Sequence, residues 1–266
     1  MDQTLRLLAD AACTLAANDR LHLVETPAPE YAPRLTAASG RLPRLAVGAV
    51  LTPQAGGPPL RIVCIGSRPG NDDIPASRIC TVAALAAGSL PAGEIPFAVA
   101  KQGIALAWIT LSDKGSQGLR ADAAGPAIAE TCAASLSLCL AKGHILPDEP
   151  GQLKALLVDL ALTQGFDLIV TTGGTGLSPR DATPEATQAV IEKRLPGFET
   201  AMLMASLAKT PHAMLSRATA GVLGGAIIVN VPGSPKAVRE TLAAIMPAIP
   251  HGLAKLHGDP ADCAQA

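Results

Sequence analysis

Aromatic side chains are scarce in this sequence of 266 residues, where Phe, Trp and Tyr together make up 2%. Proteins that bind single-stranded nucleic acids stack the bases on several clustered aromatic rings, which this composition does not supply. The formal net charge of -1 also gives no broad positive surface for a phosphate backbone. We therefore expect no nucleic-acid partner and a core built from small aliphatic side chains.

Cysteine motifs are absent as well. The six cysteines form no Cys-x-x-Cys pair and have no histidine at metal-ligand spacing. We expect reduced, mostly buried thiols in a cytoplasmic protein. The cysteines are Cys13, Cys64, Cys80, Cys132, Cys139 and Cys263.

Long uninterrupted apolar runs are also missing. The most apolar stretch, Thr81 to Leu111, is broken by Pro91, Glu94 and Lys101, which a membrane helix would have to desolvate or bend around. The N-terminus has neither the basic start nor the clean apolar core of a signal peptide. We therefore expect no membrane span and no secretion.

Two segments of different character are present. Residues 1–103 are rich in Pro and Gly, and we expect a smaller β-rich module of unknown function there, opened by a short helix over Gln3–Leu15. Residues 104–266 alternate apolar runs of strand length with helical patterns. The strand-like runs of the first segment are Leu21–Val24, Leu45–Leu51 and Leu60–Ile65.

The second segment has the alternation of an α/β domain. We expect strands at Ile104–Thr110, Leu168–Thr172 and Ala226–Val231. The expected helices are Ala123–Leu140, Leu153–Leu162, Pro184–Arg194 with Thr183 as N-cap, and Lys236–Met246. This order predicts a parallel sheet covered by helices on both faces, with ligands at the carboxyl ends of the strands.

Two glycine-bearing turns follow expected buried strands. Thr171–Gly176 comes after Leu168–Val170, and Pro232–Pro235 comes after Ala226–Val231. Glycines let phosphate oxygens approach backbone N–H groups, and hydroxyls add further donors. Either turn alone is also typical of a plain strand-to-helix connection. Together at one sheet edge they indicate a phosphate-binding cleft.

Carboxylates occur beside these turns. Asp113 follows the first expected strand with Ser112, while Asp148 and Asp181 stand in the turns Pro147-Asp148-Glu149 and Pro179-Arg180-Asp181. Most aspartates in such places cap turns. Carboxylates next to phosphate sites are, however, what Mg²⁺ uses, with substrate phosphates and water completing its shell.

The ordered set of motifs resembles the MogA/MoaB-type molybdopterin adenylyltransferases, to which the gephyrin G domain is related. The matching segments are Ser112-Asp113, Pro147-Asp148-Glu149, Thr171–Gly176, Pro179-Arg180-Asp181, Thr183–Thr187, Leu215-Ser216-Arg217, Asn230–Lys236 and Ile249-Pro250-His251. One segment departs from the family pattern, where Leu195-Pro196-Gly197-Phe198 continues into Glu199. This departure affects the helix contacts that the resemblance implies and leaves the site unaffected.

The resemblance implies a three-layer α/β sandwich around a mostly parallel sheet, assembled as a homotrimer. It implies transfer of AMP from ATP to the terminal phosphate of molybdopterin, with Mg²⁺ required and a metal-insertion protein acting downstream. Asp148 and Asp181 are the implied catalytic and metal-binding residues. The implied ligand-binding residues are Ser112, Asp113, Thr172, Gly173, Gly174, Thr175, Gly176, Pro232, Gly233, Ser234 and Pro235. Arg217 and Lys236 are candidate anion contacts.

Other functions stay open at this point. A non-catalytic molybdopterin-binding or scaffold protein would keep the cleft without turnover, because fold alone does not fix function. A metal-inserting relative of the MoeA type would carry further domains, and a nicotinamide-dependent dehydrogenase would need a different glycine spacing. For the N-terminal module, a truncated sulfur-carrier domain of the MOSC type is one interpretation.

Overall fold

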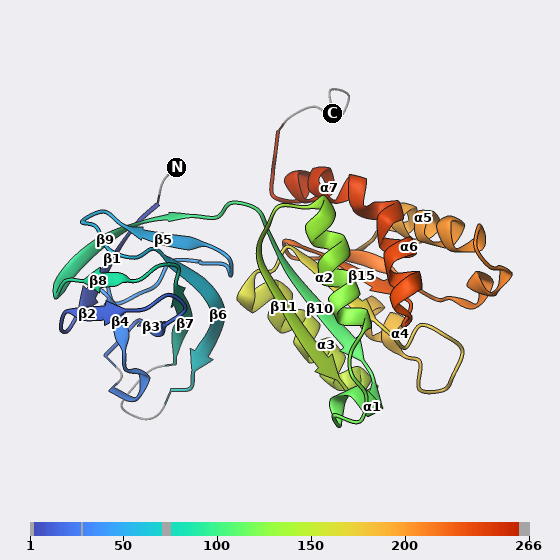
Figure 1. The fold of residues 1–266 in the computed structure, drawn as a ribbon, viewed down its shortest axis with the longest axis horizontal. Helices are drawn as coiled ribbons and strands as arrows, with labels where there is room; N and C mark the ends of the chain where they lie inside the picture. Colours follow the sequence, from blue (N-terminus) through green and yellow to red (C-terminus); the bar gives the residue numbers. More distant parts are fainter. Residues whose placement is uncertain (1–2, 28, 71–75, 261–266) are drawn as a thin grey trace. The chain divides into compact units, whose positions relative to one another are not determined.

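The computed structural model describes residues 3–27, 29–70 and 76–260, and the chain divides into two compact units between Gln102 and Gly103 (Figure 1). Each unit has its own sheet. No helix in the described part of the chain has both the length and the apolar character needed to cross a membrane.

The first unit is a closed β-barrel, which is more specific than the β-rich module expected from the sequence. Strands β2 (Cys13–Leu15) and β8 (Gly88–Leu90) pair separately from it. A short 3-10 turn, η1, spans Pro29–Tyr31. In barrel order the strands are β1 (Gln3–Ala9), β4 (Arg34–Ala37), β3 (Arg20–Val24), β7 (Ser77–Ala84), β6 (Leu60–Arg68), β5 (Val50–Pro53) and β9 (Gly93–Ala100).

The helix predicted over Gln3–Leu15 is wrong, because this segment forms strands β1 and β2. Leu5 and Leu7 are buried while Arg6 and Leu8 are exposed, which is the two-residue period of a strand with one face on the core. The strands predicted near β3 and β6 are confirmed. The run Leu45–Leu51 becomes strand only from Val50.

The second unit contains a six-stranded sheet of mixed direction. Strands β11, β10, β12 and β15 run parallel to one another. Strand β14 pairs antiparallel with β15 and β13 pairs antiparallel with β14, so the sheet is not purely parallel. Gly224, with φ +56, turns β14 back onto β15. In sheet order the strands are β11 (Leu138–Leu146), β10 (Ile104–Leu111), β12 (Leu168–Thr172), β15 (Ala226–Val231), β14 (Ala220–Leu223) and β13 (Lys193–Arg194).

Helices cover both faces of this sheet. Helices α2, α5 and α6 pack together, and α3 packs with α4. The helices are α1 (Asp113–Ser116), α2 (Ala124–Ser135), α3 (Pro150–Val158) continued by a π-helical turn η2 (Asp159–Gln164), α4 (Thr183–Gln188), α5 (Pro196–Leu207), η3 (Pro211–Leu215), α6 (Pro235–Ile245), η4 (Met246–Ala248) and α7 (Ile249–Leu256).

Three predicted helices have different ends in the structure. The helix expected over Ala123–Leu140 stops at Ser135, because the chain turns there into the edge strand β11. The helix expected to reach Arg194 ends at Gln188, and Ala182 rather than Thr183 occupies its N-cap. The helix predicted over Leu153–Leu162 is confirmed in position, although its last part is π-helical.

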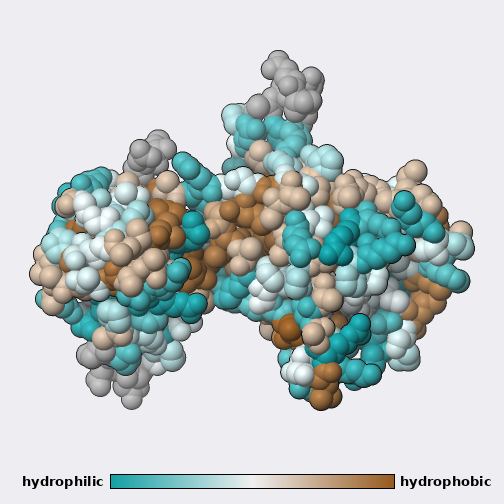
Figure 2. All heavy atoms as spheres, viewed as in Figure 1, coloured by the Kyte–Doolittle hydropathy of each residue, from teal (hydrophilic) through white to brown (hydrophobic). Residues whose placement is uncertain are grey.

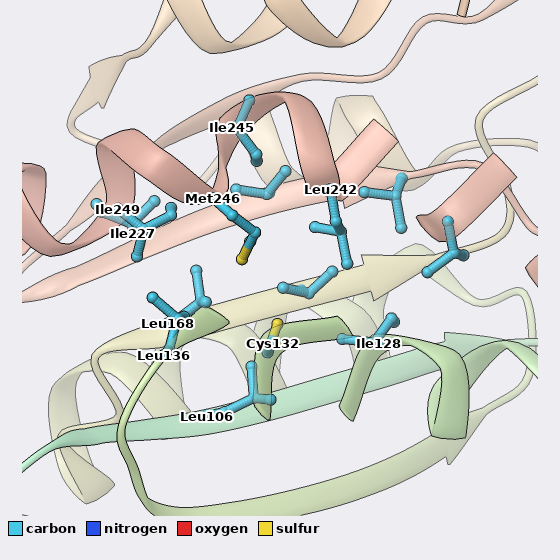
Figure 3. Close-up of a cluster of buried hydrophobic side chains, with 14 of the residues drawn as sticks. Leu106, Ile128, Cys132, Leu136, Leu168, Ile227, Leu242, Ile245, Met246 and Ile249 are labelled. Carbon is cyan, nitrogen blue, oxygen red and sulfur yellow. The ribbon is translucent and has the colours of Figure 1, made fainter. Parts of the chain in front are cut away.

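The main core of the second unit lies between the sheet and the layer of α2 and α6 (Figure 3). Leu106, Leu168 and Ile227 of three neighbouring strands meet Ile128 of α2 and Leu242 of α6 there. Burying such side chains removes apolar surface from water and fixes the sheet edge where the loops emerge. The core therefore sets the positions of the strand ends described below.

The described cysteines are free thiols, as expected. Cys80, Cys132 and Cys139 are buried, and Cys13 and Cys64 are half-buried. Burial raises the pKa of Cys80 and of Cys132 to about 12, so these thiols stay protonated and unreactive at neutral pH. Cys263 lies outside the described residues.

Candidate active site

The polar loops of the second unit emerge from the carboxyl ends of four parallel strands. Ser112 and Asp113 follow β10, Asp148 follows β11, Thr172 ends β12 and Pro232 follows β15. The Ser112 N–H donates to the Leu146 carbonyl at 2.9 Å, which joins the ends of β10 and β11. The core packing therefore brings these loops to one edge of the sheet.

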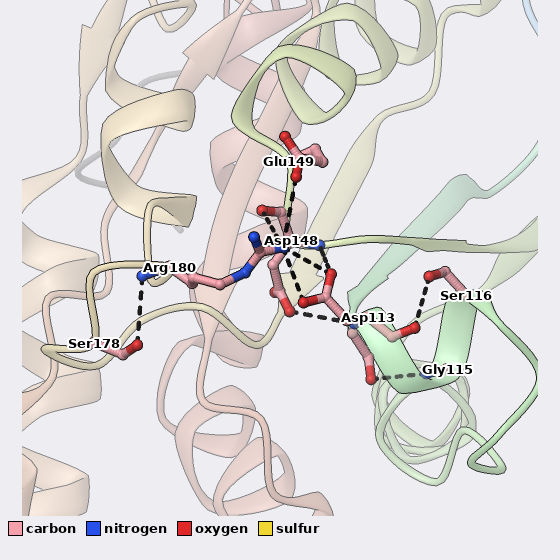
Figure 4. Close-up of polar contacts among 8 residues, drawn as sticks. Asp113, Gly115, Ser116, Asp148, Glu149, Ser178 and Arg180 are labelled. Carbon is pink, nitrogen blue, oxygen red and sulfur yellow. Dashed lines mark hydrogen bonds and ion pairs between the residues drawn. The ribbon is translucent and has the colours of Figure 1, made fainter.

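An acidic corner forms where the loops after β10 and β11 meet (Figure 4). The Asp113 N–H donates to Asp148 Oδ2 at 3.3 Å, and the Asp148 N–H donates to Asp113 Oδ1 at 3.1 Å. Arg180 reaches this corner from the loop after β12. Its Nη2 lies 2.9 Å from Asp113 Oδ2 and 3.5 Å from Glu149 Oε1. The aspartates thus hold each other's backbone while Arg180 balances part of their charge.

The electrostatics of Asp148 connect this corner to Asp181. Burial raises the pKa of the Asp148 carboxyl above its ordinary value, and the negative charges of Asp113 and Asp181 raise it further. The Asp113 N–H and the Arg180 guanidinium act in the opposite direction without cancelling the increase in this pKa. A bound cation would relieve this repulsion.

The glycine-rich turn after β12 is tightly packed rather than loose. Gly173 has φ +98, and a Cβ there would lie 2.6 Å from the Leu111 carbonyl oxygen. Gly174 has φ +63, and its Cβ would overlap the Thr183 hydroxyl at the start of α4. Both positions need glycine for backbone conformation and for space. The turn is therefore held in one shape between β10 and α4.

The second glycine turn lies against the first. The Thr172 hydroxyl donates to the Pro232 carbonyl at 2.7 Å, and a Cβ on Gly233 would be 3.5 Å from the Gly173 Cα. Ser234 caps α6, since its hydroxyl accepts the Ala237 N–H at 3.2 Å.

A cavity of about 150 Å³ lies at these turns. It is bordered by the first residues of α2 and α6, Ala124 and Pro235, where helix N-termini favour anions. The predicted site residues Ser112, Thr172, Gly173, Gly233 and Pro235 line it. Asp148 lies instead at a smaller hollow with Glu149, Arg180 and Thr183, and Leu111 borders both spaces.

The remaining predicted site residues take other positions. Thr175 is buried, and its carbonyl accepts the Arg217 N–H at 3.0 Å. Asp181 Oδ2 accepts the Ser178 N–H at 2.9 Å and lies next to Gly176, where a Cβ would come within 2.9 Å of it. These residues shape the turn rather than line the cavity.

Sequence reasoning missed the part played by Asp122. Its carboxylate accepts the N–H groups of Ala124 and Gly125 at 3.0 and 2.9 Å and the Thr110 hydroxyl at 2.8 Å. It caps α2 and borders the cavity. The signal was an aspartate directly before the expected helix Ala123–Leu140, a place that is typical of an N-terminal cap.

Metal binding by protein side chains alone is not supported in the described part of the chain, which holds no group of three or more His, Cys, Asp or Glu side chains able to bind an ion. Mg²⁺ often takes only one or two carboxylates and fills its shell with substrate phosphates and water. The acidic corner fits that mode because Asp148 lies near two further carboxylates.

Comparison with known proteins places the second unit in a family. Residues 107–251 match the family described as a probable molybdopterin binding domain. Molybdopterin adenylyltransferase of Helicobacter pylori is 42% identical over 151 residues, covering 56% of this chain and 86% of that protein. MoaB of Thermus thermophilus has a TM-score of 0.54 and 44% identity, covering 59% of this chain and 98% of its own.

Gephyrin of Dictyostelium discoideum is 38% identical over 161 residues, which are 57% of this chain but only 22% of gephyrin. The chain therefore spans about a fifth of that relative and most of the bacterial ones. The matched region 107–251 is more than half of the 266 residues. The chain belongs to the molybdopterin-binding domain family of molybdenum cofactor biosynthesis.

Proposed function

We propose that the second unit is an adenylyltransferase that transfers AMP from ATP to the terminal phosphate of molybdopterin. A phosphate oxygen of molybdopterin attacks the α-phosphorus of ATP, and the bond from that phosphorus to the pyrophosphate oxygen breaks. The observation that carries the proposal is the acidic corner of Asp113 and Asp148, whose charge is influenced by Asp181, beside two packed glycine turns at one sheet edge. The names of the bacterial relatives support the same reaction.

Alignment and electrostatics account for the chemistry of such a site. The attacking phosphate is already anionic, so the reaction needs in-line positioning and charge neutralisation more than a general base. Asp148 and Asp181 would hold Mg²⁺, and the positive charge of the ion would offset the negative charge of the phosphates. The raised pKa of Asp148 supports this role, because it shows that the ionised carboxylate lies near other negative charges. A cation bound there would offset those charges and favour the ionised form.

The glycine turns are proposed to hold phosphate groups. The cavity lined by Thr172, Gly173 and Gly233 is bordered by two helix N-termini, which attract anions without a side-chain cation. Ser112 and Pro235 complete its wall. Gly174, Thr175, Gly176 and Ser234 would act by fixing the shape of the turns, and Asp113 by holding Asp148.

The test is product formation by the full chain. Purified protein with molybdopterin, ATP and Mg²⁺ should yield adenylyl-molybdopterin, detected by mass. Asp181→Asn and Asp148→Asn should each lower kcat by at least about a hundredfold, the scale expected when electrostatic alignment of a transferring phosphoryl group is lost. Glu130→Gln is the matched control, because Glu130 is exposed and pairs only with Arg239 among the contacts of the described residues.

The rival reading, a non-catalytic molybdopterin-binding scaffold, predicts a different result in the same experiment. Molybdopterin would bind and no adenylylated product would form. The two aspartate variants would then differ from the wild type only in their affinity for molybdopterin. Wild-type turnover that survives both substitutions would remove the assigned roles of Asp148 and Asp181.

Self-association is a second part of the proposal. The resemblance noted above implies a homotrimer, and apolar side chains near the end of α5 and on η3 support an oligomer. Met204, Met214 and Leu215 are 66%, 72% and 51% exposed, and hydrophobic patches interrupt the hydrophilic surface in Figure 2. Light scattering should give three times the chain mass.

A metal-insertion protein is the proposed downstream partner, which would receive adenylyl-molybdopterin from this chain.

A further inference from the structure

Arg217 makes more contacts to the glycine-rich loop than any role as a surface cation requires. It lies between η3 and β14, and its side chain is 32% exposed. Its backbone N–H donates to the Thr175 carbonyl at 3.0 Å and its Nε donates to the Gly176 carbonyl at 2.8 Å. A single residue therefore holds the start of the loop through main chain and side chain together.

The same guanidinium also reaches the far end of the loop. Nη2 donates to the backbone carbonyl of Asp181, and Nη1 pairs with Glu185 on α4. Arg217 thus ties Gly176, Asp181 and α4 to one rigid group. Because the guanidinium is planar, its donors point in fixed directions, and the distance between Gly176 and Asp181 is fixed with them.

The position of the Asp181 carboxylate depends on this loop shape. Its Oδ2 accepts the Ser178 N–H at 2.9 Å, and it lies against Gly176, where no Cβ intervenes. Both contacts come from within the segment that Arg217 closes. If the two ends of the segment moved apart, Ser178 and Gly176 would no longer hold the Asp181 carboxylate in the place from which its charge acts on Asp148.

We propose that Arg217 is a positioning residue that clamps the Thr175–Asp181 loop and so aims Asp181 in the adenylyl-transfer site; this inference rests on the function proposed above. Arg217 is not an anion contact, since its side-chain donors are directed at two carbonyls and its charge is paired with Glu185. Lysine cannot replace it, because one ammonium on a flexible stem cannot hold Gly176 and Asp181 at a fixed spacing.

The test compares Arg217→Gln and Arg217→Lys with Arg239→Gln, a change in an exposed arginine on α6 that pairs with Glu130. Both Arg217 variants should lower kcat by about tenfold or more, as expected for a misplaced catalytic group, while the KM values for ATP and molybdopterin stay near those of the control. Hydrogen exchange at the Ser178 amide should accelerate in both variants and not in the control.

Several results would overturn the proposal. A raised KM for either substrate with unchanged kcat would mean that Arg217 contacts substrate phosphate. Full activity in Arg217→Lys, or unchanged exchange at Ser178, would show that no clamp is needed. If Arg217→Gln does not fold, Arg217→Lys decides alone. If the wild-type chain makes no product, the proposed function fails, while the exchange data still decide whether Arg217 orders the loop.

Discussion

Within the candidate site, the environment of the Asp148 carboxyl is unlike that of an ordinary surface aspartate. Burial and the nearby charges of Asp113 and Asp181 raise its carboxyl pKa. A raised carboxyl pKa means that the folded state disfavours the ionised form, so the fold is less stable at neutral pH than it would be with an uncharged side chain there. That cost is what a bound cation would remove.

Asp148→Asn should therefore raise the melting temperature at pH 7 in the absence of divalent ions, while it abolishes turnover. The gain should disappear below the ordinary carboxyl pKa of about 3.9, where the wild-type side chain is protonated in both the folded and unfolded states. Thermal unfolding across pH measures this. A lower melting temperature of the variant at pH 7 would show that Asp148 is held favourably in its ionised form.

Gly174 provides a second test at a single residue. Its φ of +63 and the contact that a Cβ would make with Thr183 both oppose any side chain. Gly174→Ala should lower the free energy of unfolding of the second unit by about 1–3 kcal/mol. Denaturant unfolding followed by Trp108, the only tryptophan of the chain, reports on this unit.

Gly151→Ala is the matched control for that substitution. Gly151 lies in α3 with open space around its Cβ position, so alanine there should stabilise the fold by up to about 1 kcal/mol. Equal effects of the two substitutions would show that the turn is not constrained as described.

At the scale of elements, Glu199 ties α5 to the antiparallel edge of the sheet. It accepts the Thr219 hydroxyl at 2.5 Å and the Ala220 N–H at 3.2 Å, and it pairs with Arg194 of β13. Burial alone would raise the pKa of Glu199, but these hydrogen bonds outweigh it and hold the pKa below its usual range.

Glu199→Gln should lower the free energy of unfolding by about 1–3 kcal/mol near neutral pH, because hydrogen bonds to a charged group are lost. A depressed carboxyl pKa stabilises the fold above the unfolded value of about 4.3, and this contribution disappears as the pH falls through the folded pKa. Denaturant unfolding at several pH values should therefore show the difference between wild type and variant shrinking below pH 4. A constant difference would contradict the assignment.

Sequence patterns predicted some elements well and others poorly for physical reasons. β12 and β15 were predicted with their bounds, because they are short apolar runs buried on both faces and ended by turn residues. β11 was missed because its first apolar residues continue an Ala- and Leu-rich pattern that reads as helix. β1 was read as a helix because its many leucines hide the two-residue period.

The candidate site was predictable only in part. The turns after β10, β12 and β15 could be placed at one edge, because the carboxyl ends of parallel strands share it. The reciprocal bonds between Asp113 and Asp148 depend on the register of β10 against β11, which no local pattern encodes. The contacts of Arg217 join residues 36 and 41 positions apart, so they also needed the structure.

At the scale of the whole molecule, the family region falls inside the second unit, while the β-barrel of the first unit has its own sheet and its own buried residues. The relative from Helicobacter pylori matches over 86% of its length with 56% of this chain. A unit with its own hydrophobic core can in principle fold alone. The barrel is therefore not expected to supply residues for adenylyl transfer.

Residues 103–266 expressed alone should fold and keep the wild-type kcat for adenylyl transfer. The measurement is the steady-state rate of the isolated unit beside that of the full chain, with circular dichroism as the check on folding. A folded but inactive unit would show that the barrel contributes to the reaction.

The central claim is that the acidic corner and the glycine turns transfer AMP to molybdopterin, and the most direct measurement is the stoichiometry of one reaction. With the full chain, ATP, Mg²⁺ and molybdopterin, pyrophosphate and adenylyl-molybdopterin should appear in equal amounts, and neither should appear when molybdopterin is omitted or in Asp181→Asn. Pyrophosphate release without adenylyl-molybdopterin, or bound molybdopterin that is never adenylylated, would contradict the account.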